Sequence, residues 1–360
     1  MINNKETFKA ILQKHIDIIV DTLISNIYGI NTIILYGGYG RDEGAWVKIN
    51  NSYEPYNDFD ILIVLNEINE KPALNQIELI KKNLLEKINI QWIDLTFIEL
   101  KDFSKSNKKS IFQFDLKNGS KVIYGNKGLL TKVNSIDSSQ IRLVEGKLLF
   151  FTRLWPFAGG AESIIDLNQS QSLFFRYQMS KAILAAIDMK LLMQGMYVSS
   201  YVDRCQLAID IGNKNDILDK DIINWAITQK LTPCNKMMKA KEVFDLQKKV
   251  AHIFSFYSLQ ILSCYYNKKF PSLMSFYKFY SKSFKENIKI IGAKILQKKI
   301  DYKKIHYFNN IQILILCVIL DEVTEDYIIK ESNNYLVKMG TPRIFNLNDL
   351  RKFISNERLS

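Results

Sequence analysis

The stretch "LYGGYGRDEGAWVKINNSYEPYNDFDILIVL", Leu35–Leu65, decides the fold prediction. It joins two short apolar runs, Thr32–Tyr36 and Asp60–Leu65, through a glycine-rich turn and an acidic pair. Apolar, β-branched runs of this length that end at turn residues are typical of buried strands. We therefore predict two strands joined by a long loop, Gly37–Asn57.

The residues around this stretch predict the rest of a mixed sheet with flanking helices. Apolar residues recur every three or four positions in Lys5–Tyr28 and in Leu74–Ile88, which indicates amphipathic helices. Ile90–Ile98 is a predicted third strand and Lys121–Gly125 a predicted fourth, closed by glycine.

Strand patterns fade after about residue 138, and helical periodicity replaces them. The most apolar run, Ile311–Leu320, is too short to span a bilayer and is interpreted as a buried core helix. Helices are predicted at Ser172–Gly195 and near 200–212, 219–229, 239–266, 284–299 and 304–322. The prediction is an α+β chain with a mixed-sheet domain, 1–135, followed by an all-helical domain, 136–360.

Composition limits the functional classes only broadly. The chain has 360 residues, 47% hydrophobic and 24% charged, which is typical of globular proteins. Its net charge of +12 suits acidic partners such as nucleotides or nucleic acid, although enrichment in Lys, Asn and Ile along the whole chain also accounts for it.

The four cysteines are too far apart in sequence for a CxxC zinc or redox motif. Scattered cysteines and a charged N-terminal segment favour a reduced, cytoplasmic compartment, with no membrane partner.

The acidic pair predicts a metal site. Side chains two residues apart in a strand share a face, so Asp58 and Asp60 project together and repel unless a cation lies between them. Oxygen-only ligands suit Mg²⁺. Asp94, in an otherwise apolar strand, could supply a third carboxylate, and such a cluster would hold two Mg²⁺ ions. A strand-capping turn, or a salt-bridged edge residue at Asp94, is the alternative.

The glycines after the first strand predict an anion-binding turn. Gly37, Gly38 and Gly40 let the backbone approach a phosphate closely, and Arg41 offers a planar fork of donors. The spacing matches neither the P-loop nor the dinucleotide-binding fingerprint. An ordinary flexible turn is the alternative interpretation.

Together, "ILYGG", "NDFDILIV" and "WIDLTF" resemble the DNA polymerase β-type nucleotidyltransferase superfamily. The string "GGYGRDEG" followed by Asp-x-Asp is similar to the bacterial uridylyltransferases that modify PII proteins. The matching residues are Gly37, Gly38, Tyr39, Gly40, Arg41, Glu43, Asp58 and Asp60. The resemblance covers roughly residues 30–125, and the sheet domain is accordingly expected to be nucleotidyltransferase-like. The spacer before Asp58 is longer than in those enzymes and their downstream domains have no counterpart, so PII is not implied as the target.

This resemblance implies Mg²⁺-dependent transfer of an NMP from an NTP, with ATP the default donor, to a small-molecule or protein hydroxyl, releasing pyrophosphate. Asp58, Asp60 and Asp94 would hold the metal, and Asp94 would also activate the acceptor. Gly37, Gly38, Tyr39, Gly40 and Arg41 would bind the nucleotide. Glu43 is expected to pair with Arg41 or with the loop backbone.

The helical half would supply base and acceptor pockets. Candidates are Lys147, Arg153, Arg176, Lys181 and Arg204, with Lys181 and Arg204 chosen as nucleotide contacts and Tyr197 and Tyr201 as stacking residues. Solvated helix faces and core packing are the alternative for all of them. His252 is interpreted as a hydrogen-bonded core residue, and Phe276–Lys289 as an amphipathic helix rather than an RNA contact.

Two other functions stay open at this stage. One is a template-independent RNA nucleotidyltransferase, for instance a tRNA-end modifier, with which the basic charge is compatible. The other is a non-catalytic nucleotide-binding or interaction protein on the same fold.

Overall fold

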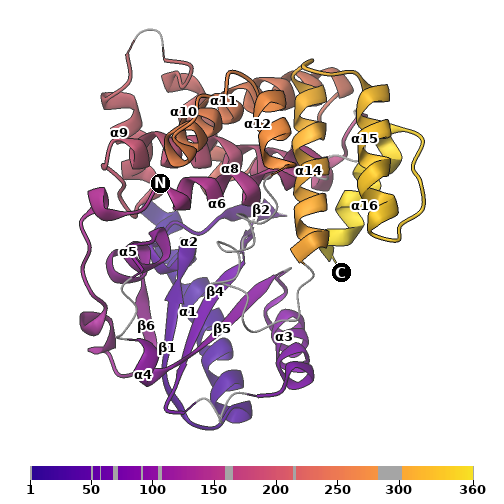
Figure 1. Ribbon diagram of the computed structural model, residues 1–360. Coiled ribbons are helices and arrows are strands. Elements are labelled where there is room, and N and C mark those ends of the chain that lie inside the picture. The colour runs from indigo at the N-terminus through magenta and orange to yellow at the C-terminus, as the bar shows by residue number, and fades with distance from the viewer. Residues whose placement is uncertain are drawn as a thin grey trace. The chain divides into compact units, whose positions relative to one another are not determined.

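The computed structural model describes residues 2–49, 52–56, 58–67, 72–90, 92–103, 108–158, 165–213, 216–282 and 302–359. The chain divides into two compact units, which are described separately (Figure 1). The first unit comprises Met1–Arg142, Gly195–Leu207 and Ile227–Pro233. The second unit comprises Leu143–Gln194, Ala208–Ala226 and Cys234–Ser360. A nucleotidyltransferase-like role for 1–135 and a base- and acceptor-binding role for 136–360 stay predictions.

The first unit is built on a four-stranded mixed sheet of order β5-β4-β1-β6 (Figure 1). Its strands are β1 (Ile30–Tyr36), β4 (Phe59–Leu65), β5 (Ile93–Glu99) and β6 (Lys121–Gly125). β1 is antiparallel to both β4 and β6, whereas β4 and β5 run parallel. This sheet and the helical remainder of the chain confirm the predicted α+β class.

Alternation along the strands gives the sheet two apolar faces. Odd-numbered residues such as Ile33, Ile61 and Ile63 pack in one cluster with helices α1 (Ile2–Asn26) and α3 (Leu74–Ile88). Even-numbered residues form the opposite cluster. Its members are Ile34, Leu62 and Val64 with residues of α4 (Leu100–Phe103), α5 (Ile111–Asn118) and the 3₁₀ turn η2 (Leu129–Lys132).

The prediction of a loop at Gly37–Asn57 is wrong over most of that range. It contains a short helix, α2 (Gly37–Gly40), and a two-stranded hairpin of β2 (Trp46–Ile49) and β3 (Ser52–Pro55). Phe8 of α1 stabilises the hairpin, because its ring stacks on Trp46 at 4.6 Å and meets Tyr53 edge-on at 4.8 Å. The hairpin was missed because polar residues interrupt the strand pattern, while the packing partner lies in a distant helix.

The second unit is helical. Its helices are α6 (Val144–Arg153), α7 (Trp155–Ala158), α8 (Gln169–Met193), α11 (Ala240–Tyr266), α12 (Leu273–Tyr280), α14 (Tyr302–Ile319), α15 (Glu325–Lys338) and α16 (Leu347–Leu359). Segments of α9 (Tyr201–Asp210) and α10 (Lys220–Leu231) also belong to it. Aromatic side chains fill the core: Phe150 of α6 stacks on Phe254 of α11 at 5.9 Å and meets Phe276 of α12 edge-on at 5.6 Å.

Ile311–Leu320 lies largely in α14, whose residues from Ile311 to Cys317 are buried, and this confirms the predicted core helix. The helix expected at 284–299 lies outside the described residues. Within the part of the chain that the structure describes, no helix has the length and apolarity needed to cross a membrane. None of Cys205, Cys234, Cys264 and Cys317 forms a disulfide bond within the described residues.

Candidate functional site

Three carboxylates gather where two parallel strands begin. Asp60 of β4 and Asp94 of β5 are direct partners in the parallel register. Asp58 lies one residue before β4 begins at Phe59. Because parallel strands start at the same edge of a sheet, this arrangement places all three at one sheet end. We call Asp58, Asp60 and Asp94 the acidic edge.

Asp94 is exposed, although it lies in the otherwise apolar strand predicted at Ile90–Ile98. β5 begins only at Ile93, which makes Asp94 the second residue of its strand. At a strand end, water can solvate a carboxylate that the strand interior would desolvate. Asp60 is likewise the second residue of its strand, and this position at the strand end explains how β4 accommodates a carboxylate.

The hydroxyl group of Tyr36 lies near the acidic edge. Its hydroxyl lies 3.4 Å from Thr96 Oγ1, and the ring of Phe112 on α5 meets its ring edge-on at 5.5 Å. Burial raises the pKa of Tyr36, and the charges of Asp60, Asp94 and Asp58 raise it further. All three carboxylates therefore lie near enough to Tyr36 to act on its hydroxyl group.

Gly37 makes the closest approach to the acidic edge. Its φ is +67°, and a Cβ at this position would lie 1.9 Å from Asp60 Oδ2. Any side chain would therefore collide with the carboxylate while adopting an unfavourable backbone conformation. The glycine that begins α2 is thus required by Asp60, which links the glycine turn to the acidic edge.

The donor set of the acidic edge fits a hard cation. Carboxylate oxygens are the ligands that Mg²⁺ prefers, and it usually binds one or two carboxylates together with water and substrate phosphates. Asp60 and Asp94, paired in register, meet that requirement. Over the described ranges, however, no group of three or more His, Cys, Asp or Glu side chains is close enough to hold a metal. The structure therefore does not show the predicted three-ligand cluster.

Tyr39, predicted to bind nucleotide, is a core residue with 1% exposure. Its ring stacks on Phe59 at 4.5 Å, and its hydroxyl donates to the carbonyl of Ala45 at 2.8 Å. A Cβ on Gly44 would lie 2.1 Å from the same ring. The side chain of Tyr39 therefore supports the turn from inside the fold.

Arg41 is engaged by protein groups. Its side chain is 5% exposed, and its Nη1 donates to Asp115 Oδ2 of α5 at 3.2 Å. Its Nε lies 3.4 Å from Glu43 Oε2, so the two residues form the expected ion pair. Its guanidinium carbon also lies 4.6 Å from the ring centre of Tyr201. These contacts give Arg41 a structural role in the turn.

Glu43 caps helix α9. Its carboxylate accepts hydrogen bonds from Ser200 Oγ at 2.8 Å and from the backbone N–H groups of Tyr201 at 2.8 Å and Val202 at 3.1 Å. The first N–H groups of a helix lack partners within it, so a carboxylate there satisfies them and complements the helix dipole. The motif thus joins the glycine turn to a segment more than 150 residues away in sequence.

Arg204 joins the same network in the first unit. It is 2% exposed, its Nη2 donates to the carbonyl of Ser199 at 2.6 Å and lies 3.8 Å from Asp115 Oδ2. The hydroxyl of Tyr197 lies 3.2 Å from both oxygens of Asp115. Sequence reasoning missed Asp115, since an acidic residue in a short amphipathic helix resembles any solvated position.

The other basic candidates lie in the second unit. Lys181 is half-buried, with its Nζ 4.7 Å from the ring centre of Tyr177 on the same helix. Lys147 is buried, with its Nζ 5.1 Å and 4.9 Å from the rings of Tyr265 and Tyr266.

Arg153 and Arg176 are half-buried. The core role predicted for His252 is wrong, because its side chain is exposed on α11, and the buried histidine of this unit is His306. In the helix expected at Phe276–Lys289, Phe276 and Tyr280 are buried and Lys278 is exposed, while 283–289 lies outside the described residues.

Comparisons with known proteins add one distant structural likeness. No family model matches the chain, and no curated protein matches it either. A crystal structure of spectinomycin adenyltransferase from Enterococcus faecialis, solved with ATP and spectinomycin, aligns with a TM-score of 0.39 at 15% identity. The alignment covers 71% of this chain and 97% of that one.

Proposed function

We propose that the first unit is a metal-dependent nucleotidyltransferase that moves an NMP from an NTP to a hydroxyl of a small molecule or protein. The observation that carries the proposal is the pairing of Asp60 with Asp94 in the parallel register, beside Asp58 and the side-chain-free Gly37. Nucleotidyl transfer needs oxygen ligands for a hard cation next to a backbone that can approach phosphates. The acidic edge and the glycine turn provide both.

Each residue has a role in this proposal. Asp60 and Asp94 would hold Mg²⁺, with Asp58 adding charge, and a bound Mg²⁺ would neutralise the charge of the triphosphate. Gly37, at the glycine turn, would let the Asp60 carboxylate lie close to the backbone that approaches the phosphates.

Asp94, which is exposed, would accept the proton of the acceptor hydroxyl. A bond then forms from the acceptor oxygen to the α-phosphorus, the α–β phosphoanhydride bond breaks, and pyrophosphate leaves. Lys181 stays a proposed nucleotide contact, and ATP the proposed donor.

Arg41 and Arg204, which the sequence predicts as nucleotide contacts, take a different role in this proposal. Both side chains are buried against Asp115 and Tyr201, so we assign them to the support of the glycine turn. In this proposal the phosphates contact the backbone of α2 and the cation rather than these guanidinium groups.

Calorimetry tests the proposal without knowledge of the acceptor. ATP, CTP, GTP and UTP are titrated with and without Mg²⁺ into the wild type, Asp60→Asn and Asp94→Asn. The matched control is Asp21→Asn, an exposed carboxylate on α1 of the same unit. We expect one NTP to bind only with Mg²⁺, at least about tenfold more weakly in the two edge variants, because even the loss of a group that orients a metal ligand costs on the order of 10–100-fold.

Equal binding by all variants, or no Mg²⁺-dependent binding of any NTP, would overturn the assignment. Binding at the acidic edge without pyrophosphate release, once acceptors are supplied, would instead support the non-catalytic alternative.

A further inference from the structure

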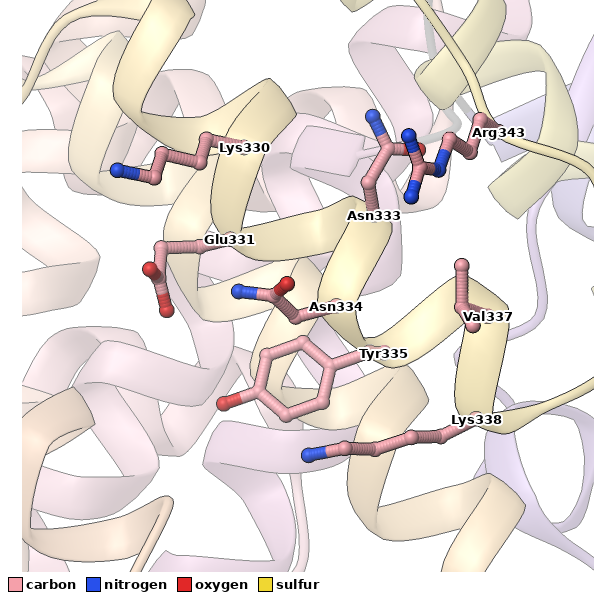
Figure 2. Close-up of a pocket in the computed structure, with 8 residues that line it drawn as sticks. All are labelled: Lys330, Glu331, Asn333, Asn334, Tyr335, Val337, Lys338 and Arg343. Carbon is pink, nitrogen blue, oxygen red and sulfur yellow. The ribbon is translucent and has the colours of Figure 1, made fainter.

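The second unit carries a groove along α15 that the proposed transfer does not use. Two hollows flank this helix, one of about 580 Å³ and one of about 480 Å³. Both are lined by Glu331, Tyr335 and Lys338, so the two hollows adjoin along the helix. We call their combined lining the α15 groove. Its first part is drawn in Figure 2.

The groove is strongly basic. Among the described residues, its lining includes five exposed cationic side chains, Lys278, Lys282, Lys330, Lys338 and Arg343, against a single carboxylate, Glu331. His306 adds no charge at neutral pH, because burial lowers its pKa. A concave surface with this charge balance concentrates anions.

Tyrosines also line the groove, namely Tyr277, Tyr307, Tyr327 and Tyr335. Tyr277 and Tyr335 are buried, and their hydroxyl groups lie 2.9 Å apart. The ring of Tyr307 lies 5.4 Å from that of Tyr335, and Lys338 Nζ lies 5.8 Å from both ring centres. Tyr307 and Tyr327 remain partly exposed, so the groove offers aromatic surface beside its cations.

Hydrogen bonds hold the chain segment beside Arg343 in place. Asn333 accepts from the backbone N–H of Ile344 and donates to its carbonyl, both at 2.8 Å. These bonds anchor the segment that carries Arg343 against α15, and Figure 2 shows Asn333 and Arg343 side by side. Phe345, one residue further, is 82% exposed. An aromatic ring so fully exposed extends the apolar surface beyond the groove.

Glu331 and Asn334 add polar groups between the cations. Glu331 accepts a hydrogen bond from the Tyr277 hydroxyl at 3.2 Å, which fixes one of its oxygens. In Figure 2, Glu331, Asn334, Tyr335 and Lys338 project to the same side of α15. A carboxylate and an amide can pair with the amino and carbonyl groups of a nucleobase.

From this combination we propose that the α15 groove binds single-stranded nucleic acid. Exposed cations suit the phosphates, and partly exposed tyrosines suit unpaired bases, which stack on aromatic rings without regard to sequence. Duplex nucleic acid keeps its bases stacked inside the helix and would leave the tyrosines unused. The inference uses residues of the second unit alone, so it stands or fails independently of the nucleotidyl-transfer proposal.

Fluorescence anisotropy with a labelled single-stranded RNA of 12 nucleotides tests it on the full chain. The test variant is Lys330→Glu/Lys338→Glu/Arg343→Glu. The matched control, Lys220→Glu/Lys236→Glu/Lys241→Glu, changes the net charge equally at exposed positions outside the groove. We expect the groove variant to bind the RNA at least about tenfold more weakly. The slope of log K against log salt concentration should become less negative by about two, as the loss of three contacts to a single strand predicts.

A second pair of variants separates stacking from charge. Tyr327→Ala should weaken binding about fivefold or more, whereas Tyr327→Phe, which keeps the ring, should bind as the wild type does. Circular dichroism confirms that each variant is folded, and Lys330→Glu/Arg343→Glu replaces the triple variant if Lys338 proves necessary for folding.

Three results would overturn the proposal. The first is absence of RNA binding at 100 mM salt, and the second is equal weakening by the control triple variant. The third is unchanged binding by Tyr327→Ala together with equal affinity for polyphosphate or duplex RNA, which would reduce the groove to a general polyanion surface.

Discussion

Removal of the Glu43 carboxylate should loosen the first turn of α9 and destabilise the first unit. Glu43 is 8% exposed and accepts three hydrogen bonds, two of them from the backbone N–H groups of Tyr201 and Val202. In Glu43→Ala those two donors would cost about 1 kcal/mol each, as for a lost helix cap. Loss of the Arg41 pairing inside the fold adds about 1 kcal/mol or more. We expect a total loss of about 3 kcal/mol.

Hydrogen exchange measures this effect where it should occur. The amides of Tyr201 and Val202 should exchange on the order of 100-fold faster in Glu43→Ala, since about 1.4 kcal/mol corresponds to a factor of ten. Urea unfolding measures the free energy for the same variants. Glu43→Gln keeps an acceptor oxygen and should lose about half as much stability.

The matched control is Glu78→Ala, on α3 of the same unit. Glu78 lies 3.3 Å from Lys81 in an exposed pair three residues apart, and its side chain is 70% exposed. Its removal should cost about 0.5 kcal/mol or less. If Glu43→Ala lost no more stability than Glu78→Ala, and the α9 amides kept their protection, the capping role of Glu43 would be refuted.

Two further predictions concern other contacts. In urea unfolding, Gly37→Ala should destabilise the protein by at least about 1 kcal/mol more than Gly340→Ala. Both glycines have a positive φ, but only at Gly37 would a Cβ collide with the Asp60 side chain. Equal losses of stability would contradict this prediction. Asp216→Asn should cost about 3 kcal/mol at pH 7, because Lys190 Nζ lies 2.6 Å away in a buried pair. Although burial acts to raise the pKa of Asp216, hydrogen bonds from Lys190 and other donors hold it below the usual 3.8. Its stabilisation is therefore complete above pH 3.8, and the difference from the wild type should shrink as the pH falls below that value; a constant difference would contradict the pairing.

The sequence by itself determined the sheet and most of the secondary structure of the first unit. β1 and β4 are short β-branched runs bounded by glycine, aspartate or asparagine, and such local patterns need no tertiary information. The acidic pair at the start of β4 was visible for the same reason. The long amphipathic helices of the second unit were predicted from their apolar periodicity alone.

The tertiary structure decided which residues act together. Only the parallel pairing of β4 and β5 sets Asp94 opposite Asp60, and only the turn at Gly37 brings the backbone to the Asp60 carboxylate. Packing likewise sets the ring of Tyr39 on Phe59 and the guanidinium of Arg41 on Asp115, partners 20 and 74 residues away that the sequence alone did not indicate. The identity of a residue shows what it can bind, but burial decides what it does bind, since a group already satisfied inside the fold is not available to a ligand.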